Sequence, residues 1–353
     1  MTTDLFAAAS ESMRAQLEAA VPPDCRQAID SVLEVGRDGP DVVVTSPAWM
    51  PRPGAVHFLP AFTAIEAGEH TLRFELSVLA DAMWSAWAGT IGVGRATFAP
   101  VPTRVPAGRS GAELVADVDV WECSLPVDAV RLRVRLRGIE REQLARMPWA
   151  VTLSAWNRRP PSTCVPAPGR VMLEVPPRSQ HEEGGAIGHR ICSPTSVAMV
   201  LEYCGRRVGV EDLAASMFQP SVDLYGVWPA AIQAAARHGV AGFLLRFPDW
   251  AAATWCLRQQ IPIIASVRYR ADELTGAAVT ETSGHLLVLT GWDGRDVLVN
   301  DPAASSTRDV RRRYPLDEIC RVWLGRTGVG YVLFDAMRRK VPAAPGSRST
   351  TGG

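Results

Sequence analysis

The stretch SQHEEGGAIGHRICSPTSVAMVL, residues 179–201, decides how the carboxy-terminal half of this chain is expected to fold. A polar, glycine-rich segment runs up to Cys192, an apolar segment follows, and Pro194 falls in the first turn of the helix expected there. Proline suits this position because the first N–H groups of a helix have no partner within the helix. The stretch therefore predicts a cysteine at the amino terminus of a helix.

Among the seven cysteines, Cys192 is the candidate nucleophile. Unpaired N–H groups and the positive end of the helix dipole stabilise a thiolate over a thiol and so raise nucleophilicity near neutral pH. A lone cysteine more commonly fills a small buried space, so this interpretation depends on its neighbours. The odd number of scattered cysteines, without a CxxC pair, argues against a disulfide framework and a zinc site, and we expect most thiols to be reduced.

A base for this thiol is predicted in the stretch SGHLLVLTGWDGRDVLVNDP, residues 283–302. His285 opens an apolar strand that leads through a tight turn into a second strand. A side chain on the second strand could hold the imidazole in one tautomer, so that its other nitrogen faces the thiol. His285 is therefore the candidate base.

Two hairpin registers give two candidates for the residue that orients His285. With a three-residue loop, 292–294, His285 lies opposite Asp301. With a two-residue loop, 293–294, the register shifts by one and Asn300 becomes diagonal to His285. Both registers stay open at this point, with Asn300 as the alternative orienter.

Four motifs follow one another along the chain: SQ at 179–180, CSPTSVAM at 192–199, GHLLVL at 284–289 and NDP at 300–302. In this order they resemble the C39-like, papain-like family of bacterial cysteine peptidases, over about residues 171–335. Two features depart from the family pattern. Ser193 stands where the family usually has glycine, and the segment from Gln180 to Cys192 is longer than in the transporter-linked members.

The resemblance implies a role for each matching residue. Cys192 attacks a carbonyl, His285 is its base, Asp301 orients the histidine and Gln180 supplies the oxyanion hole. Acyl transfer builds negative charge on the carbonyl oxygen, which the Gln180 amide and the backbone N–H of Cys192 could stabilise together. The implied enzyme is a cysteine-dependent peptidase or amidase, a hydrolase that cleaves a peptide or amide bond through a Cys-His-Asp catalytic triad and an acyl-enzyme.

Two alternatives to hydrolysis stay open. An acyltransferase or amide-forming biosynthetic enzyme would use the same thiol but release the acyl group to an amine or another nucleophile. A non-catalytic binding protein would keep the papain-like domain as a scaffold. The presence of Cys192, His285 and Asp301 together argues against the scaffold, because a site without chemistry has no physical need of all three.

The predicted fold class is α+β, with a papain-like domain, helices first and then an antiparallel sheet, preceded by a mainly-β, sandwich-like domain. Strict alternation of apolar and charged residues over 70–78 and 130–137 predicts half-buried strands. The expected organisation is a helical segment at 1–40 (helices 5–20 and 24–35), a β-sandwich-like domain at 41–157, a Pro-rich linker at 158–170, the catalytic domain at 171–340 and a disordered tail at 341–353. Further strands are expected at 42–45, 83–98, 113–123, 149–156, 241–246, 261–267, 285–291, 296–300 and 329–335, and helices at 193–204, 211–217 and 227–238.

Charge and composition exclude several classes of partner. Lysine plus arginine and aspartate plus glutamate each total 37, so no net field draws nucleic acid or an anionic membrane. The amino terminus lacks a basic segment followed by an apolar run, and no stretch is apolar enough to span a bilayer, so we expect a cytoplasmic protein. We expect no cofactor, and no metal, because His181 and His189 do not have zinc-site spacing; they should line the cleft or face solvent.

Two groups of residues outside these motifs are expected to be structural. Arg131, Arg133, Arg135 and Arg137 should form a charged outer strand face opposite acids such as Asp117, Asp119 and Glu122. The tryptophans of the amino-terminal half should fill its core rather than bind carbohydrate: Trp84, Trp87, Trp121, Trp149 and Trp156. Trp292 lies in the expected hairpin turn and should be exposed.

Overall fold

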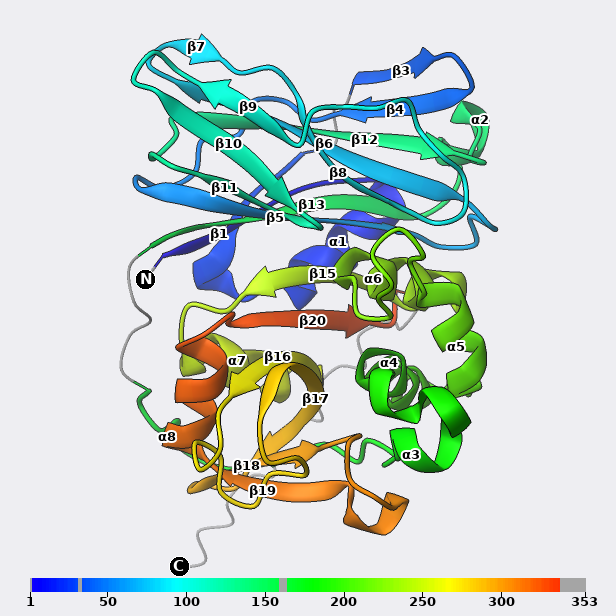
Figure 1. The fold of residues 1–353 in the computed structure, drawn as a ribbon, viewed down its shortest axis with the longest axis vertical. Coiled ribbons are helices and arrows are strands. Elements are labelled where there is room, and N and C mark those ends of the chain that lie inside the picture. The colour runs from blue at the N-terminus through cyan, green and yellow to red at the C-terminus, as the bar shows by residue number, and fades with distance from the viewer. Residues whose placement is uncertain (1, 31–33, 159–163, 337–353) are drawn as a thin grey trace, which may run out of the picture.

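The computed structural model describes residues 2–30, 34–158 and 164–336. The strands of this part of the chain form three β-sheets. Figure 1 shows two layers of strands at one end, formed by the amino-terminal half, and a third sheet with most of the helices at the other end. The expected tail at 341–353 and residues 159–163 of the expected linker lie outside the described residues.

The first two sheets come from the amino-terminal half. Across the first sheet the order is β2 (Arg26–Asp30), β1 (Thr3–Ala9), β13 (Trp149–Asn157), β5 (Ala55–Ala64), β11 (Val120–Cys123), β10 (Ala112–Asp117) and β9 (Arg104–Ala107). The second sheet has β3 (Glu34–Asp38), β4 (Asp41–Thr45), β12 (Ala129–Arg137), β6 (Thr71–Ala80) and β7 (Met83–Trp84), and β8 (Ala88–Val93) also pairs with β6. One apolar cluster contains side chains of both sheets, among them Phe58, Phe62, Phe74 and Leu132.

Strand β1 corrects the prediction of a helix over residues 5–20. The segment Thr3–Ala9 is a strand buried along its whole length, antiparallel to β13, and only Glu11–Ala20 is helical (α1). Its side chains alternate between two cores, because Leu5 and Ala7 join the cluster shared with the carboxy-terminal half, whereas Phe6 and Ala8 join the cluster between the two sheets. A strand buried on both faces has no polar face, so its sequence lacks a period of two.

The predicted helix over 24–35 is also wrong. The short 3-10 turn η1 (Pro23–Cys25) leads directly into strand β2, which runs parallel to β1. The amino-terminal segment is thus part of the sheets and not a helical segment before them. Strand β5 was not predicted at all, for the same reason as β1, since each is apolar on both faces.

The third sheet and its helices confirm the α+β character of the protein. The sheet order is β15 (Ala241–Arg246), β20 (Val329–Phe334), β16 (Ile263–Tyr269), β17 (Thr282–Trp292), β18 (Asp296–Asn300) and β19 (Arg311–Pro315), with β14 (Val171–Met172) also on β17. The helices are α3 (Gln180–Glu183), α4 (Cys192–Tyr203), α5 (Val210–Met217), α6 (Trp228–Arg237), α7 (Trp250–Arg258) and α8 (Leu316–Ile319), with η2 (Gly185–Arg190), η3 (Thr307–Asp309) and η4 (Cys320–Leu324); the amino-terminal half adds α2 (Arg141–Leu144). Helix α7 lies between β15 and β16, so helices do not all precede strands as expected.

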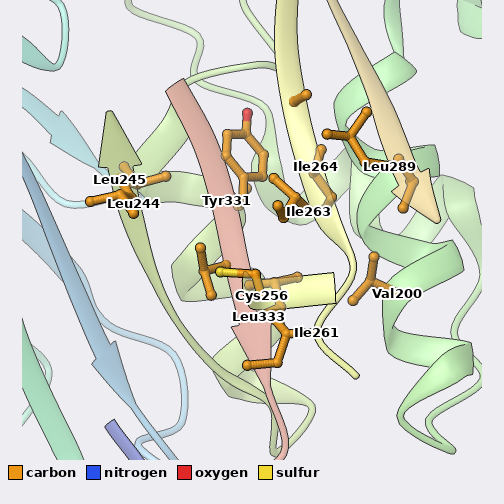
Figure 2. Close-up of a cluster of buried hydrophobic side chains, with 14 of the residues drawn as sticks. Val200, Leu244, Leu245, Cys256, Ile261, Ile263, Ile264, Leu289, Tyr331 and Leu333 are labelled. Atoms are coloured by element: carbon orange, nitrogen blue, oxygen red, sulfur yellow. The ribbon is translucent and has the colours of Figure 1, made fainter. Parts of the chain in front are cut away.

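Helix α4 packs against the third sheet through a wide apolar surface. Val200 of α4 belongs to the same buried cluster as Ile264 of β16 and Leu289 of β17. Figure 2 shows these side chains together with residues of β15 and β20. The helix that begins at Cys192 is therefore fixed to strand β17, which carries His285.

The two halves share a continuous apolar core. Leu59 and Ala61 of β5 belong to the cluster that also contains Ile232 of α6 and Phe243 of β15. A polar contact joins the same surfaces, because the backbone N–H of Arg246 donates to Ser154 Oγ at 3.1 Å. Strand β15 accordingly lies directly beside the first sheet in Figure 1.

One disulfide is present, although the scattered cysteines argue against a disulfide framework. Cys164 and Cys320 are bonded across a sequence separation of 156 residues, with 6.1 Å between their Cα atoms. Cys25, Cys123, Cys192 and Cys256 carry free thiols. A pair so distant in the chain has no sequence signature. Disulfides are typical of oxidising compartments, so this bond does not support the expected cytoplasmic location, which stays a prediction. None of the helices in the described ranges is both long and apolar enough to cross a bilayer.

Candidate active site

Cys192 is the first residue of α4, as the sequence predicts. Ile191, the residue before it, anchors the helix start, because its carbonyl accepts from the Thr195 backbone N–H at 3.0 Å and from the Thr195 hydroxyl at 2.8 Å. Ser196 Oγ donates to the carbonyl of Leu286 in β17 at 3.2 Å, which ties the first turn of α4 to the residue after His285. The Cys192 side chain is half-buried, and its thiol lies close enough to His285 for the histidine to lower the pKa of the thiol.

His285 is held between Cys192 and Asp301. Its Nε2 lies 2.8 Å from Asp301 Oδ1, and both side chains are buried. Because Nε2 is engaged with the carboxylate, Nδ1 is the ring nitrogen left for the thiol. The structure thus brings Cys192, His285 and Asp301 into one chain of contacts.

Both hairpin registers expected from the sequence are wrong. Trp292 pairs with Val297, which leaves a four-residue loop, and an irregularity between Leu289 and Gly291 shifts the register once more, so that Val288 pairs with Asn300. Strand β18 ends there, three residues short of the level of His285. Asp301 reaches the histidine from the turn after the strand and not from a cross-strand position.

That turn fixes the Asp301 carboxylate. The backbone N–H of Asp301 donates to the Val310 carbonyl at 2.8 Å, Oδ1 also accepts from the Ala303 N–H at 3.0 Å, and Oδ2 accepts from the Tyr314 hydroxyl at 2.7 Å. Tyr314 lies on β19 and is fully buried. Tyr314 was not predicted as a site residue, because no sequence spacing links a tyrosine on β19 to the carboxylate of Asp301.

The electrostatics of the three groups favour an ion pair. Burial by itself raises the pKa of Cys192, but the hydrogen bond and charge of His285, with the N–H groups of Leu286 and Ser193, outweigh burial and lower it. Burial likewise opposes the His285 cation, but Asp301 and the Cys192 thiolate raise the pKa of His285. Burial raises the pKa of Asp301, but the charge of His285 and the hydrogen bonds from His285, Tyr314 and the Ala303 N–H outweigh burial and lower the pKa. The arrangement favours a thiolate beside an imidazolium.

Gln180 is attached to the turn that carries Asp301. Its backbone N–H donates to the Pro302 carbonyl at 2.9 Å, and the preceding Ser179 donates through Oγ to the Ala304 carbonyl at 2.7 Å. The Gln180 side chain is 4% exposed, and its Oε1 has no hydrogen-bond partner among the described residues. A buried amide without partners is costly, so its dipole is available to a bound group.

Asn300 is engaged elsewhere and does not orient His285. Its Nδ2 donates to the carbonyl of Val175 at 3.0 Å and to that of Pro176 at 3.4 Å. These contacts hold the segment that leads to Ser179 and Gln180. Of the two candidate orienters, Asp301 contacts His285, whereas Asn300 contacts the chain that leads to Gln180.

The comparisons with known proteins fit this half of the chain. Residues 172–331 match the family model described as "Peptidase_C39 like family". The predicted resemblance over about residues 171–335 is thereby confirmed, and residues 172–331 are called the C39-like region below. No curated protein matches the chain.

Three solved structures are similar to the C39-like region. A double glycine motif protease from an AMS/PCAT transporter, in complex with its leader peptide, is 20% identical over 47% of this chain and 94% of its own, with a TM-score of 0.33. A C39-like peptidase from Bacillus anthracis is 20% identical over 48% and 98%, with a TM-score of 0.37. The peptidase domain of Streptococcus ComA, an ABC transporter involved in quorum sensing, is 15% identical over 41% and 92%, with a TM-score of 0.32.

Ser193, the departure from the family pattern in the C39-like region, has a partner in the third sheet. Its Oγ lies 3.1 Å from the hydroxyl of Tyr331 on β20, and both residues are buried. A serine at this position therefore satisfies a buried tyrosine hydroxyl that glycine would leave without this contact. Tyr331 was not singled out from the sequence.

The remaining histidines expected near the cleft do not join the site. His181 and His189 are exposed, which agrees with the expectation that they face solvent. Within the described ranges, no group of three or more His, Cys, Asp or Glu side chains could hold a metal ion. Trp292, expected to be exposed, is 2% exposed: its ring packs edge-on against Trp250, and its Nε1 donates to the Ala167 carbonyl at 2.9 Å.

The arginine face of β12 has other counter-ions than those expected. Arg135 contacts Glu75 and Asp41, and Arg137 contacts Asp41, whereas Asp119 accepts the backbone N–H of Trp228 at 2.8 Å. The acids lie on the neighbouring strands β6 and β4 of the same sheet, because β12 pairs with both. Trp121 is fully buried as expected, but Trp84 and Trp87 lie under Arg131 and Arg133 on the outer face.

Proposed function

We propose that the C39-like region is a cysteine peptidase that cleaves an amide bond through Cys192, His285 and Asp301. The observation that supports this most directly is the contact chain in which Asp301 holds His285 Nε2 at 2.8 Å and leaves the other ring nitrogen to the Cys192 thiol. A nucleophile, a base and an orienting group within hydrogen-bond reach are the minimum set for covalent acyl transfer.

The proposed reaction begins from the thiolate and imidazolium. The Cys192 thiolate attacks the carbonyl carbon, and the carbonyl oxygen gains the negative charge. As the C–N bond breaks, His285 gives its proton to the leaving amine, and a thioester to Cys192 remains. Neutral His285 then takes a proton from water, the resulting hydroxide attacks the thioester, and the carboxylic acid leaves with the thiol regenerated.

Gln180 is the proposed side-chain donor to the oxyanion. Its backbone N–H donates to Pro302, next to Asp301, and its side-chain Oε1 is buried without a hydrogen-bond partner among the described residues. A fixed donor near the reacting carbonyl stabilises the charge that develops in the transition state. We propose a peptide as substrate, in keeping with the family and with the leader peptide bound to one similar structure.

The amino-terminal half is proposed to be a sandwich-like domain over residues 2–157. The apolar cluster between its two sheets supports this, and so does β1, which makes the domain begin well before the expected boundary at residue 41. The remaining boundaries, a linker at 158–170 and a catalytic domain at 171–340, stay predictions.

The test of the mechanism is the rate of Cys192 alkylation by iodoacetamide as a function of pH, followed by mass spectrometry of the Cys192 peptide. We expect Cys192 in the native protein to react faster at pH 6–7 than an ordinary thiol, whose pKa is about 8.5, and the advantage to vanish in His285→Ala. His238→Ala is the matched control, because His238 follows α6 and has no contact with the site. An ordinary thiol profile, unchanged in His285→Ala, would contradict the proposal.

A further inference from the structure

A large cavity lies between the two halves of the protein, away from Cys192, His285 and Asp301. Its volume is about 1090 Å³. One wall comes from the ends of β6 and β8 and the segment that follows β8, and the other from α5, the segment after it and the last residue of α6. This volume is in the range of small-molecule sites, which often form at domain interfaces.

Four arginines and only two acids line this cavity. The cations are Arg73, Arg95, Arg137 and Arg237, and the acids are Glu69 and Asp212. Two of the cations are already neutralised by acids outside the cavity. Arg73 pairs with Glu75 at 2.7 Å and Arg137 pairs with Asp41 at 2.7 Å.

Arg95 and Arg237 are the cations left over. Within the described ranges neither guanidinium makes a hydrogen bond or an ion pair, and Nε of Arg237 is buried without a partner. They come from different halves, since Arg95 follows β8 whereas Arg237 ends α6. Burial lowers the pKa of Arg237, nearby Glu69 acts in the opposite direction, and Arg95 lowers it further, so the two like charges repel each other.

A favourable interaction with the α6 helix dipole explains the position of Arg237 but not that of Arg95. A cation in the last turn of a helix interacts favourably with its carbonyl groups, which accounts for Arg237. Arg95 gains nothing from that dipole and adds like-charge repulsion. Two unpaired guanidinium groups that face one cavity are a favourable site for an oxyanion, which they can bind with charge-assisted hydrogen bonds.

The walls of the cavity are fixed before any ligand binds. The Gln219 side chain accepts the backbone N–H of Gly94 at 3.1 Å, and Gln233 Nε2 donates to the carbonyl of His70 at 2.9 Å. Both contacts join the two halves beside the cavity. An apolar surface is also present, because the Phe98 ring lies 5.1 Å from the guanidinium carbons of Arg73 and Arg137.

We propose that this cavity binds a small organic anion, whose carboxylate or phosphate group lies between Arg95 and Arg237 and whose carbon skeleton packs on Phe98. The ligand would contact both halves and so increase the stability of their interface. The site is independent of the proposed peptidase chemistry, because none of its lining residues belongs to the candidate active site.

The test is titration calorimetry of the full-length protein with two probes, inorganic phosphate and succinate. We expect at least one probe to bind, with affinity reduced at least tenfold in Arg95→Gln and in Arg237→Gln. Arg170→Gln is the matched control, since Arg170 is exposed and does not line the cavity. Preference for phosphate or for succinate assigns the anionic group of the natural ligand.

Thermal unfolding separates loss of the site from loss of the fold. The unliganded Tm of each variant should stay within a few degrees of the parent, while the rise in Tm that the bound probe causes in the parent should disappear in Arg95→Gln/Arg237→Gln. The proposal is overturned if neither probe binds the parent protein, or if the double variant binds both probes as tightly as the parent does.

Discussion

Asp301 shows how much of the site depends on a single buried carboxylate. Three donors fix it: His285 Nε2, the Ala303 N–H and the Tyr314 hydroxyl. We propose that a carboxylate held in this way sets both the tautomer and the position of the imidazole. The same charge stabilises the imidazolium that balances the Cys192 thiolate.

Asp301→Asn should therefore test the role of the Asp301 charge while the shape of the side chain is kept. The amide fills the same space but cannot stabilise the imidazolium, so kcat/KM on a cleavable peptide is expected to fall about 100- to 10,000-fold. The alkylation profile of Cys192 should shift toward the ordinary thiol pKa. Tyr314→Phe, which removes one donor and keeps the charge, should cost much less, and equal losses in the two variants would contradict the assignment.

Gln180→Ala tests the proposed oxyanion donor. Removal of one such donor typically lowers kcat about 100- to 1,000-fold. Alkylation of Cys192 involves no carbonyl oxygen, so its rate and pH profile should not change. If Gln180→Ala slows alkylation as much as it slows peptide cleavage, Gln180 supports the structure of the site and does not act on the transition state.

At the scale of elements, Asp119 links the halves of the protein through helix α6. It lies in the turn between β10 and β11, and its Oδ2 accepts the Trp228 N–H, the first residue of α6, at 2.8 Å. The N–H donor favours the carboxylate, but burial is the larger effect and raises the pKa of Asp119 to about 7.

This shift gives stability a predictable pH dependence. Between pH 4 and 7 Asp119 is protonated in the folded protein but ionised in the unfolded chain. Unfolding therefore releases a proton, and the contribution of Asp119 to the free energy of unfolding falls as pH rises through this window. Asp119→Asn should remove that slope and raise the unfolding free energy at pH 8 by about 1–4 kcal/mol. Denaturant titrations at pH 5 and pH 8 measure both effects. Asp117→Asn, which removes a nearby charge that raises this pKa, should reduce the slope without abolishing it.

At the scale of the whole molecule, the Cys164–Cys320 disulfide closes a loop with a sequence separation of 156 residues that includes most of the C39-like region. Loop closure restricts the unfolded chain, so Cys320→Ser is expected to lower the unfolding free energy by about 2–4 kcal/mol. Dithiothreitol should lower the stability of the parent protein similarly and leave Cys320→Ser unaffected. If reductant changes neither protein, the bond contributes nothing to stability in solution.

The shared core predicts that the halves depend on each other. Phe243 and Ile232 belong to a cluster that continues into β5 of the amino-terminal half. A fragment of residues 171–353 would expose this surface, so we expect it to aggregate or to bind a hydrophobic dye, whereas the full-length chain does neither. A monomeric fragment with normal stability would show that the interface is dispensable.

The proposed chemistry could be inferred from the sequence because it depends on local features. A cysteine at a polar-to-apolar junction with Pro194 indicates a helix start, and a histidine before an apolar run indicates a strand. Neither prediction needs long-range information. Strictly alternating strands such as β6 and β12 could be predicted for the same reason, since polar or charged side chains on one face leave a period of two even where, as in β6, that face is buried.

Only the tertiary structure decided which groups meet. Asp301 rather than Asn300 contacts His285, because an irregular strand pairing and a turn beyond β18 move the carboxylate to the histidine. Strands β1 and β5 could not be recognised, because burial on both faces removes the periodicity. Tyr314, the disulfide and the anion cavity bring together residues far apart in the chain. Their positions follow from the packing of whole elements, which no local pattern encodes.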